Sequence, residues 1–139
     1  MKKYPDVTLK MILKHSDKIL ILRHRNGTYD FPGGQVKWNE ELFDALKREL
    51  REELNYQLEE HPRLFHIWNY ISKPKKRHSV MVYFIYDLDK IYDFVPETDT
   101  EILWLTKDEM KSVVRDSDFV ERMYRWKDPQ TPRSLFYSV

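Results

Sequence analysis

The sequence contains no cysteine, and this absence excludes several kinds of chemistry at once. Disulfides, thiolate zinc sites, iron–sulfur clusters and a cysteine nucleophile all need a residue that the chain lacks. A strong charge of one sign is also missing, because 24 lysine and arginine residues nearly balance 23 acidic residues and leave a net charge of +1. The chain as a whole is therefore neither a strongly basic nucleic-acid binder nor an acidic disordered segment.

Long apolar runs are absent as well. No segment approaches the ~20 apolar residues of a membrane-spanning helix, and residues 1–6 lack the apolar stretch of a signal peptide. We therefore expect a soluble, cytoplasmic protein with no membrane partner. The chain has 139 residues, of which 41% are hydrophobic, and this is enough for one core of ordinary size. We predict a single domain over residues 1–139.

Glycine is scarce and unevenly distributed. The chain has only three glycines, and all of them, Gly27, Gly33 and Gly34, lie in one short segment. Glycine permits backbone conformations that other residues avoid. The clustering therefore predicts unusual backbone geometry in this segment.

Apolar patterns along the chain predict an α/β fold. Alternating or continuous apolar stretches predict β-strands at residues 7–14, 18–25, 65–71, 79–87 and 102–105. Helical periodicity predicts helices at residues 40–54, 107–114 and 119–126. The 79–87 strand is apolar on both faces, as is typical of a central strand that is covered on each side. Strands interleaved with helices favour a mixed β-sheet between helical layers.

The 40–54 helix carries an unusual cluster of carboxylates. Asn39 is placed to cap its start, and Asn55 is suited to the left-handed conformation that ends many helices. At ~100° per residue, Glu49, Glu52 and Glu53 fall together beside the apolar stripe of the helix. Such close carboxylates repel each other unless a positive charge lies among them.

Two cations can offset this repulsion. Arg48 lies four residues before Glu52 and can pair with it. A hard divalent ion is the other choice, and a site made only of oxygen atoms suits Mg²⁺ or Mn²⁺ better than zinc. A solvated, charge-rich helix face is the plain alternative to a metal site.

The segment around this helix resembles a known signature. Residues 33–56 read GGQVKWNEELFDALKRELREELNY and resemble the Nudix hydrolase signature, GX5EX7REUXEEXGU, in which U is a bulky apolar residue. The positions in register are Gly34, Glu40, Arg48, Glu49, Leu50, Glu52, Glu53 and Tyr56. The charged and glycine positions would coincide by chance on the order of once in 10⁷ windows. Asn55 replaces the last glycine of the pattern, and asparagine also tolerates a left-handed backbone.

The resemblance implies a fold, a chemistry and a set of metal ligands. The implied fold is a Nudix-type α/β/α sandwich with a mixed β-sheet. The implied reaction is Mg²⁺-dependent hydrolysis of a diphosphate linkage, and we expect a nucleoside triphosphate or a related nucleotide as the substrate. The metal ligands would be Glu49, Glu52 and Glu53, with the Gly33 carbonyl as a fourth. Arg48 would orient Glu49 or Glu52.

The resemblance leaves the general base open. In some family members it is a signature glutamate, here Glu49. In others it is a carboxylate on a later loop, for which Glu97 and Glu101 are the candidates. Either of the later residues can equally be a solvated loop residue. Glu40 is expected to support the loop and not to touch metal.

Substrate-binding candidates lie outside the helix. They are Arg23, Phe31, Gly34 and Tyr70. His66, Trp68 and Tyr70 share one face of a strand and can stack on a base, although we favour a core position for them. The segment 73–78 carries four formal positive charges, for which we favour a solvated loop over a site that steers a long polyphosphate or an RNA 5′ end.

Three alternatives remain at this stage. The substrate can be a dinucleoside polyphosphate or a 5′-triphosphate RNA, although RNA is not favoured. The protein can also be a non-catalytic nucleotide sensor on the same fold. A homodimer is compatible with the family, but the sequence identifies no interface.

Overall fold

The structure, a computed structural model, describes residues 4–129. Its strands are β1 (Asp6–His15), β2 (Lys18–His24), β3 (Tyr29–Asp30), β4 (Gly33–Gln35), β5 (Arg63–Ser72), β6 (Arg77–Asp87) and β7 (Thr100–Leu105). Its helices are α1 (Leu42–Leu54), α2 (Lys107–Lys111) and α3 (Ser117–Arg125). No helix within residues 4–129 has the length and apolar character needed to span a membrane.

Strand β1 is the centre of a mixed sheet. It pairs in parallel with β6, and β5 continues the sheet as the antiparallel neighbour of β6. The other edge of β1 is shared by two partners, since β4 pairs with its first half and β2 with its last residues. β2 then diverges from β1 and pairs with β3 and β7. The divergence places the glycine-rich segment in the middle of the molecule.

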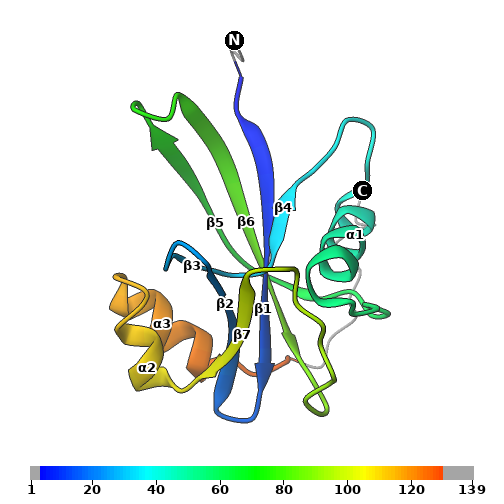
Figure 1. Ribbon diagram of the computed structural model, residues 1–139, viewed down its shortest axis with the longest axis vertical. Helices are drawn as coiled ribbons and strands as arrows, with labels where there is room; N and C mark the ends of the chain where they lie inside the picture. The colour runs from blue at the N-terminus through cyan, green and yellow to red at the C-terminus, as the bar shows by residue number, and fades with distance from the viewer. Residues whose placement is uncertain (1–3, 130–139) are drawn as a thin grey trace.

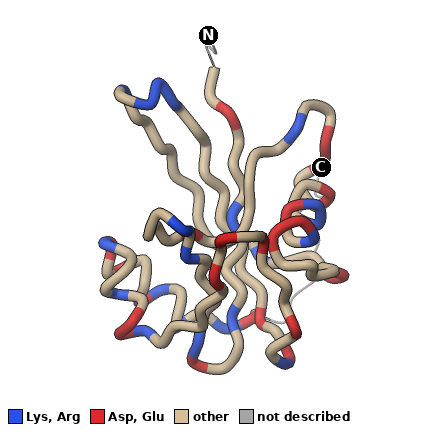
Figure 2. Tube along the Cα trace, viewed as in Figure 1, with Lys and Arg blue, Asp and Glu red and all other residues tan. Residues whose placement is uncertain are grey.

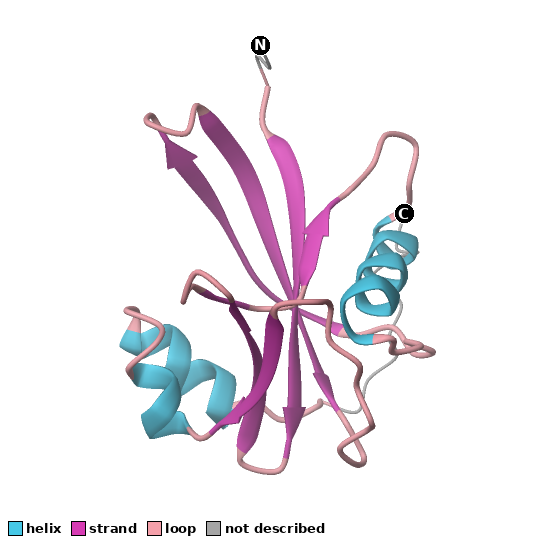
Figure 3. Ribbon diagram, viewed as in Figure 1, coloured by secondary structure: helices cyan, strands magenta, loops and turns pink. Residues whose placement is uncertain are grey.

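The sheet separates two apolar cores (Figures 1 and 3). Leu9, Met11 and Leu13 of β1 face the core beneath α1, which also contains Leu46 and Leu50. The opposite core lies beneath α2 and α3 and includes Ile12, Ile85 and Phe119 among its members. This arrangement confirms the predicted α/β/α sandwich with a mixed sheet.

The alternation of β6 also follows the prediction of a strand covered on both sides. Val82 and Phe84 belong to the core under α1, whereas Ile85 belongs to the core under α2 and α3. β6 lies between β1 and β5 in the sheet. Its apolar side chains therefore join both layers of helices to the same strand.

The start of α1 differs from the prediction. The helix begins at Leu42, and its N-cap is Glu41, whose side chain makes no capping hydrogen bond. The expectation that Asn39 caps the helix is wrong, because Asn39 has a left-handed backbone with φ of 65° and lies in the preceding turn. The end of the helix is as predicted: Asn55 has φ of 52°, and its N–H donates to the carbonyl of Arg51.

Candidate active site

The glycine-rich segment lies directly against the carboxylates of α1. Gly33 has φ of 144°, and a Cβ atom there would collide with the Leu9 backbone. A Cβ atom on Gly34 would overlap the carboxylate of Glu49. Gly33 therefore requires glycine for its backbone angle and for the approach of the Leu9 backbone, whereas a side chain at position 34 would force the Glu49 carboxylate to move. The unusual geometry predicted for this segment is confirmed.

Glu53 is the most buried carboxylate of this group. Its Oε1 accepts a hydrogen bond of 2.6 Å from the backbone N–H of Gly33. Burial, with a smaller effect of the negative charge on Glu49, raises the pKa of Glu53 to about 7, although the Gly33 hydrogen bond and Lys10 oppose the change. A cation bound here would replace the lost hydration and favour the ionised form.

Arg48 holds the other side of the group in place. Its Nη1 donates to Glu49 at 2.7 Å, its Nε donates to Glu40 at 2.8 Å, and its Nη2 donates to the carbonyl of Gln35 at 3.0 Å. The hydrogen bonding of Arg48 to Glu40 holds the pKa of the Glu40 carboxyl well below its usual range, at about 2. Glu40 also accepts from the Lys37 N–H, so it fastens the loop to the helix.

The expected pairing of Arg48 with Glu52 is the weakest of its contacts. Arg48 lies 3.7 Å from Glu52 but 2.7 Å from Glu49, and the Glu52 side chain is 55% exposed. The geometry therefore favours Glu49 as the carboxylate that Arg48 orients. Glu52 projects into solvent from the same helix.

The donor set fits a hard divalent cation that is completed by substrate. No three acidic or histidine side chains within residues 4–129 already lie close enough to enclose a metal ion. Mg²⁺ does not need such an enclosure, because proteins commonly hold it with one or two carboxylates while water and substrate phosphates supply the other ligands. Glu49 and Glu53 lie one turn apart on α1, both against the Gly33–Gly34 backbone, and supply such a pair.

An aromatic cavity of about 560 Å³ includes Asp30 and Phe31, which lie just before the Gly33–Gly34 segment, and the charge of Asp30 acts on the pKa of Glu53. Its lining comes from β2, β3, β5, β6, the α2–α3 connection and α3, and comprises Ile21, Tyr29, Asp30, Phe31, His66, Trp68, Tyr83, Val113, Val114, Asp116 and Phe119. Phe31 and Tyr83 meet edge to face, with ring centroids 6.0 Å apart. A planar apolar group can therefore lie among aromatic walls within a largely preformed cavity.

Lys10 connects the cavity with the carboxylate group. Its Nζ donates to Asp30 at 2.8 Å and to the carbonyl of Phe31 at 3.3 Å, and only 10% of its side chain is exposed. The same ammonium acts on the pKa of Glu53. One buried lysine therefore holds Asp30 and Phe31 of the cavity wall in place and also lies close enough to Glu53 to act on its charge.

The other candidates from the sequence lie in varied places. Glu101 accepts from Arg23 at 3.3 Å across the β2–β7 pair, and both side chains are largely exposed. Glu97 is exposed on the segment before β7. The preference for a core position is wrong for Trp68, which is 44% exposed and lines the cavity. Tyr70 lies farther along the same face of β5 and is half-buried.

Sequence reasoning missed most of the cavity. Lys10, Asp30, Tyr83 and Asp116 come from separate elements and belong to no motif. One signal was available, because Lys10 stands between Leu9 and the apolar run 11–13, and a buried lysine requires partners.

Comparison with known proteins agrees with this arrangement. The family model described as NUDIX domain matches residues 4–127. The chain belongs to the NUDIX family. This Nudix protein is 41% identical over 61 residues to an 8-oxo-dGTP diphosphatase of Buchnera aphidicola subsp. Schizaphis graminum (strain Sg). The match covers 40% of this chain and 46% of that protein, so it spans about half the length of the relative.

Solved structures share the fold of this Nudix protein. A MutT NUDIX hydrolase from Burkholderia pseudomallei aligns with a TM-score of 0.74 and 22% identity, over 86% of this chain and 98% of that one. A C. elegans Ap4A hydrolase aligns with a TM-score of 0.68 and 14% identity, over 84% of this chain and 93% of that one. The predicted MutT-like Nudix family and fold are therefore confirmed. The relatives also support the predicted class of enzyme, a hydrolase that acts on pyrophosphate bonds.

Proposed function

We propose that this Nudix protein hydrolyses a phosphoric anhydride bond of a nucleoside triphosphate or a related nucleotide, with Mg²⁺ as its cofactor and Mn²⁺ as a substitute. The observation that carries the proposal is the placement of two carboxylates, Glu49 and Glu53, against a glycine backbone and beside an aromatic cavity. The carboxylates suit the metal–phosphate end of a nucleotide, and the cavity suits its base.

The residues that would hold the metal are Glu49, Glu52 and Glu53, with the Gly33 carbonyl as a further ligand. A bound Mg²⁺ would neutralise the phosphates, which the carboxylates alone repel, and it would favour hydroxide formation from water. Arg48 fixes the direction of the Glu49 carboxylate through a 2.7 Å hydrogen bond. The absence of side chains at Gly33 and Gly34 lets the Leu9 backbone and the Glu49 carboxylate lie close to this segment.

The cavity supplies recognition of the base in this proposal. Phe31, Trp68 and Tyr83 offer ring surfaces on which a base can stack. The carboxylates of Asp30 and Asp116 lie at the same cavity and accept hydrogen bonds from N–H groups. A volume of about 560 Å³ falls in the range of small-molecule sites.

Glu49 is our first choice as the general base, because it lies at the proposed metal site and Arg48 orients it. Glu101 would have to leave its 3.3 Å contact with Arg23, and Glu97 lies in the exposed segment before β7. A non-catalytic sensor is less well supported, because nucleotide binding alone has no need for carboxylates beside an anionic ligand.

Turnover of a substrate panel tests the proposal. The panel contains the common nucleoside triphosphates, 8-oxo-dGTP, ADP-ribose, nucleotide sugars, dinucleoside polyphosphates and 5′-triphosphate RNA, each with and without Mg²⁺. Glu53→Gln should lower kcat by about 10³-fold or more with little change in folding. Glu59→Gln, at an exposed position just beyond α1, is the matched control and should retain full activity. Near-normal turnover by Glu53→Gln would remove Glu53 from the metal site.

A further inference from the structure

The β5–β6 ribbon is free of acidic side chains over almost its whole length. The chain contains 23 aspartate and glutamate residues, yet none lies between Arg63 and Tyr86. Four cations lie where the two strands join: Lys73, Lys75 and Lys76 in the connection, and Arg77 at the start of β6. Figure 2 shows this positive tip at the end of the ribbon. The overall charge of the protein is near neutral, so the ribbon is a local concentration of positive charge.

One face of the ribbon carries a row of aromatic side chains. Trp68 lies opposite Met81, and Tyr70 lies opposite Ser79, so both point to the side of the sheet that bears α2 and α3. The two rings meet edge to face at 6.2 Å. The helices stand at the other end of this face and leave the ribbon uncovered (Figure 1). Trp68 is 44% exposed.

This row runs from the aromatic cavity to the positive tip. Trp68 is already part of the cavity wall, and the guanidinium of Arg77 lies 5.9 Å from the ring centroid of Tyr70 at the far end. Beyond Tyr70, a groove of about 530 Å³ is lined by the four cations, by Gln35 of β4 and by one acidic residue, Asp6, whose carboxylate lies 3.7 Å from Arg77. The cavity, the two rings and the groove therefore follow one another along β5, and together they form the surface considered below.

The register of the sheet gives the length of this surface. Gly33 pairs with Lys10, whereas Ser79 at the tip pairs with Asp6. Four residues of a strand span ~13 Å, and β6 lies one strand beyond β1. The surface thus extends well past the space that one nucleotide occupies in the cavity.

We propose that this face binds the following nucleotides of a single-stranded nucleic acid whose 5′-phosphorylated end occupies the carboxylate site and the cavity. The inference rests on the proposed function and names the substrate class of the same site. A chain continues from the 3′ oxygen of its first nucleotide, so it must leave the cavity along an open surface. Two neighbouring aromatic rings followed by a group of cations suit unpaired bases joined by phosphates, since the rings stack on bases and the cations contact phosphates. Inorganic polyphosphate would use only the cations.

A binding measurement tests this face independently of turnover. The probe is a 3′-labelled, 5′-monophosphorylated eight-nucleotide oligouridylate, and fluorescence anisotropy measures its Kd with the Glu53→Gln protein. The triple variant Lys73→Glu/Lys75→Glu/Lys76→Glu should raise the Kd at least tenfold. The dependence of log Kd on log salt should also fall by about 2, since each phosphate contact contributes about 0.7 for a single strand.

Two controls separate the proposed face from general electrostatics. Lys18→Glu/Lys90→Glu/Lys127→Glu makes the same charge change at exposed positions away from the ribbon tip and the cavity, and should change the Kd less than twofold. Tyr70→Ala should weaken oligouridylate binding about fivefold without a change in the salt dependence. Equal losses in both triple variants, or displacement of the probe by inorganic polyphosphate together with no effect of Tyr70→Ala, would overturn the proposal.

A turnover series distinguishes the two proposals. Substrates with a 5′-triphosphate and one, two, four or eight nucleotides should show a rising kcat/KM in the wild type, by about tenfold from one to four nucleotides. The lysine variant should lose this increase. The series is measured with both RNA and DNA of the same sequence, and the difference shows which of the two sugars the protein prefers. Hydrolysis of mononucleotides with no length effect would overturn this inference and leave the proposed function intact, whereas tight oligonucleotide binding with no hydrolysis of any substrate would overturn the proposed function.

Discussion

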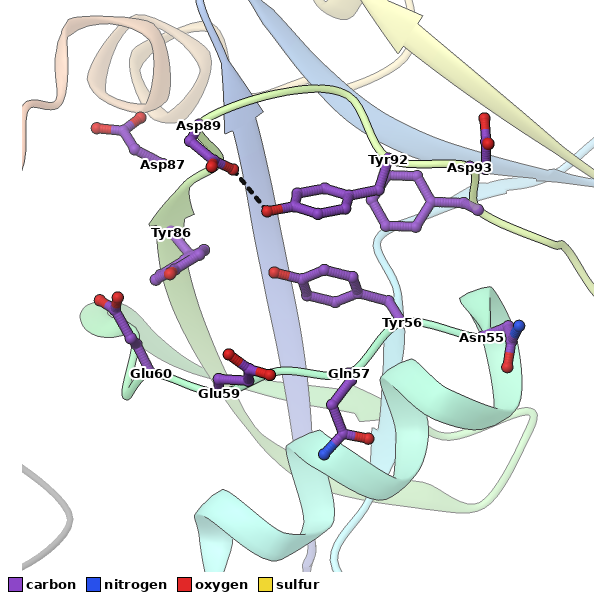
Figure 4. A pocket seen from close by; sticks show the side chains of 11 residues that line it. Asn55, Tyr56, Gln57, Glu59, Glu60, Tyr86, Asp87, Asp89, Tyr92 and Asp93 are labelled. Carbon is purple, nitrogen blue, oxygen red and sulfur yellow. Dashed lines mark hydrogen bonds between the residues drawn. The ribbon is translucent and has the colours of Figure 1, made fainter.

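Two groups of acidic residues lie beside α1, and they differ in burial, in hydrogen-bond partners and in the direction of their pKa shifts. The first, which we call the carboxylate site, consists of Glu49, Glu52 and Glu53. The second, the tyrosine pocket, is a cavity of about 650 Å³ beyond the end of α1 (Figure 4). Its lining comprises Asn55, Tyr56, Gln57, Glu59, Glu60, Tyr86, Asp87, Asp89, Tyr92, Asp93 and Phe94.

The tyrosine pocket has more carboxylates but no buried one. All of its aspartates and glutamates are exposed, and the Tyr92 hydroxyl donates to Asp89 at 2.6 Å. This hydrogen bond lowers the pKa of Asp89, whereas burial raises the pKa of Glu53 in the carboxylate site. A count of acidic residues is thus a poor indicator of function. The carboxylate site differs because glycine backbone and one arginine hold its groups in a partly desolvated position.

The role of the glycine backbone can be tested with one methyl group. In Gly34→Ala, the new Cβ would overlap the carboxylate of Glu49 and displace it from the position that Arg48 sets. Displacement of a reacting group by about 1 Å can cost about a hundredfold, so we expect a loss of at least this size in kcat/KM. Steady-state kinetics on the best substrate of the panel measures it.

Gly27→Ala is the matched control for this substitution. Gly27 has φ of 86°, but a Cβ atom there meets nothing within 4 Å. The control should lose some stability through backbone strain and retain kcat/KM. Equal activity losses in the two variants would show that general destabilisation, and not the position of Glu49, explains the effect.

Substitution of Arg48 is expected to lower activity less than Gly34→Ala does. Arg48→Lys keeps the positive charge but cannot contact Glu40, Glu49 and the Gln35 carbonyl at once, because an ammonium is a point charge and lacks the planar fork. Loss of such an orienting partner typically costs about tenfold to a hundredfold in activity or metal affinity. Isothermal titration with Mg²⁺ measures the loss of metal affinity, and kinetics as a function of Mg²⁺ concentration measures the loss of activity. Arg51→Lys, on the exposed side of α1, should leave both unchanged.

The pH dependence of stability compares the two groups without any substrate. Well below pH 4.5, Glu53 is protonated in both the folded and the unfolded protein. As the pH rises, Glu53 ionises first in the unfolded chain, and in the folded protein it ionises only near its pKa of about 7. The free energy of unfolding of the metal-free protein should therefore fall between pH 4.5 and pH 8, by up to about 3 kcal/mol from this residue. Urea unfolding in EDTA measures it.

Glu53→Gln should remove most of this pH dependence, and Asp89→Asn in the tyrosine pocket should not. Addition of Mg²⁺ at pH 8 should stabilise the wild type more than Glu53→Gln, because the ion replaces the proton as the partner of the carboxylate. An identical pH profile in the wild type and Glu53→Gln would contradict the buried, raised-pKa description of Glu53.

The contrast also shows which parts of the site the sequence could predict. The carboxylates of α1 were predictable because helical spacing is local and brings Glu49 and Glu53 to one side of the helix. The left-handed Asn55 was predictable for the same reason. The Asn39 cap was not, because the tight loop before α1 gives Asn39 a positive φ while Glu40 is drawn to Arg48 and Lys37.

The aromatic cavity depended on information that no local pattern contains. Trp68 reaches it only because β5 has an irregular register between Leu64 and His66, after which its face alternation is shifted. The cavity also depends on the divergence of β2 from β1 and on α2 and α3 covering only one end of the sheet. These are properties of the assembled sheet, so the strand pattern predicted an α/β fold but not the wall of the site.

The smallest expected effect lies in the tyrosine pocket itself. Tyr92→Phe removes the 2.6 Å hydrogen bond to Asp89 while keeping the ring, whose centroid lies 5.3 Å from that of Tyr56. Because Asp89 is exposed, water replaces the lost partner, and the free energy of unfolding should change little. Activity should be unchanged, since the pocket shares no residue with the carboxylate site or the aromatic cavity. Thermal unfolding and kinetics on one substrate suffice, and a clear loss of kcat would show that the two acidic groups are coupled through α1 and not independent.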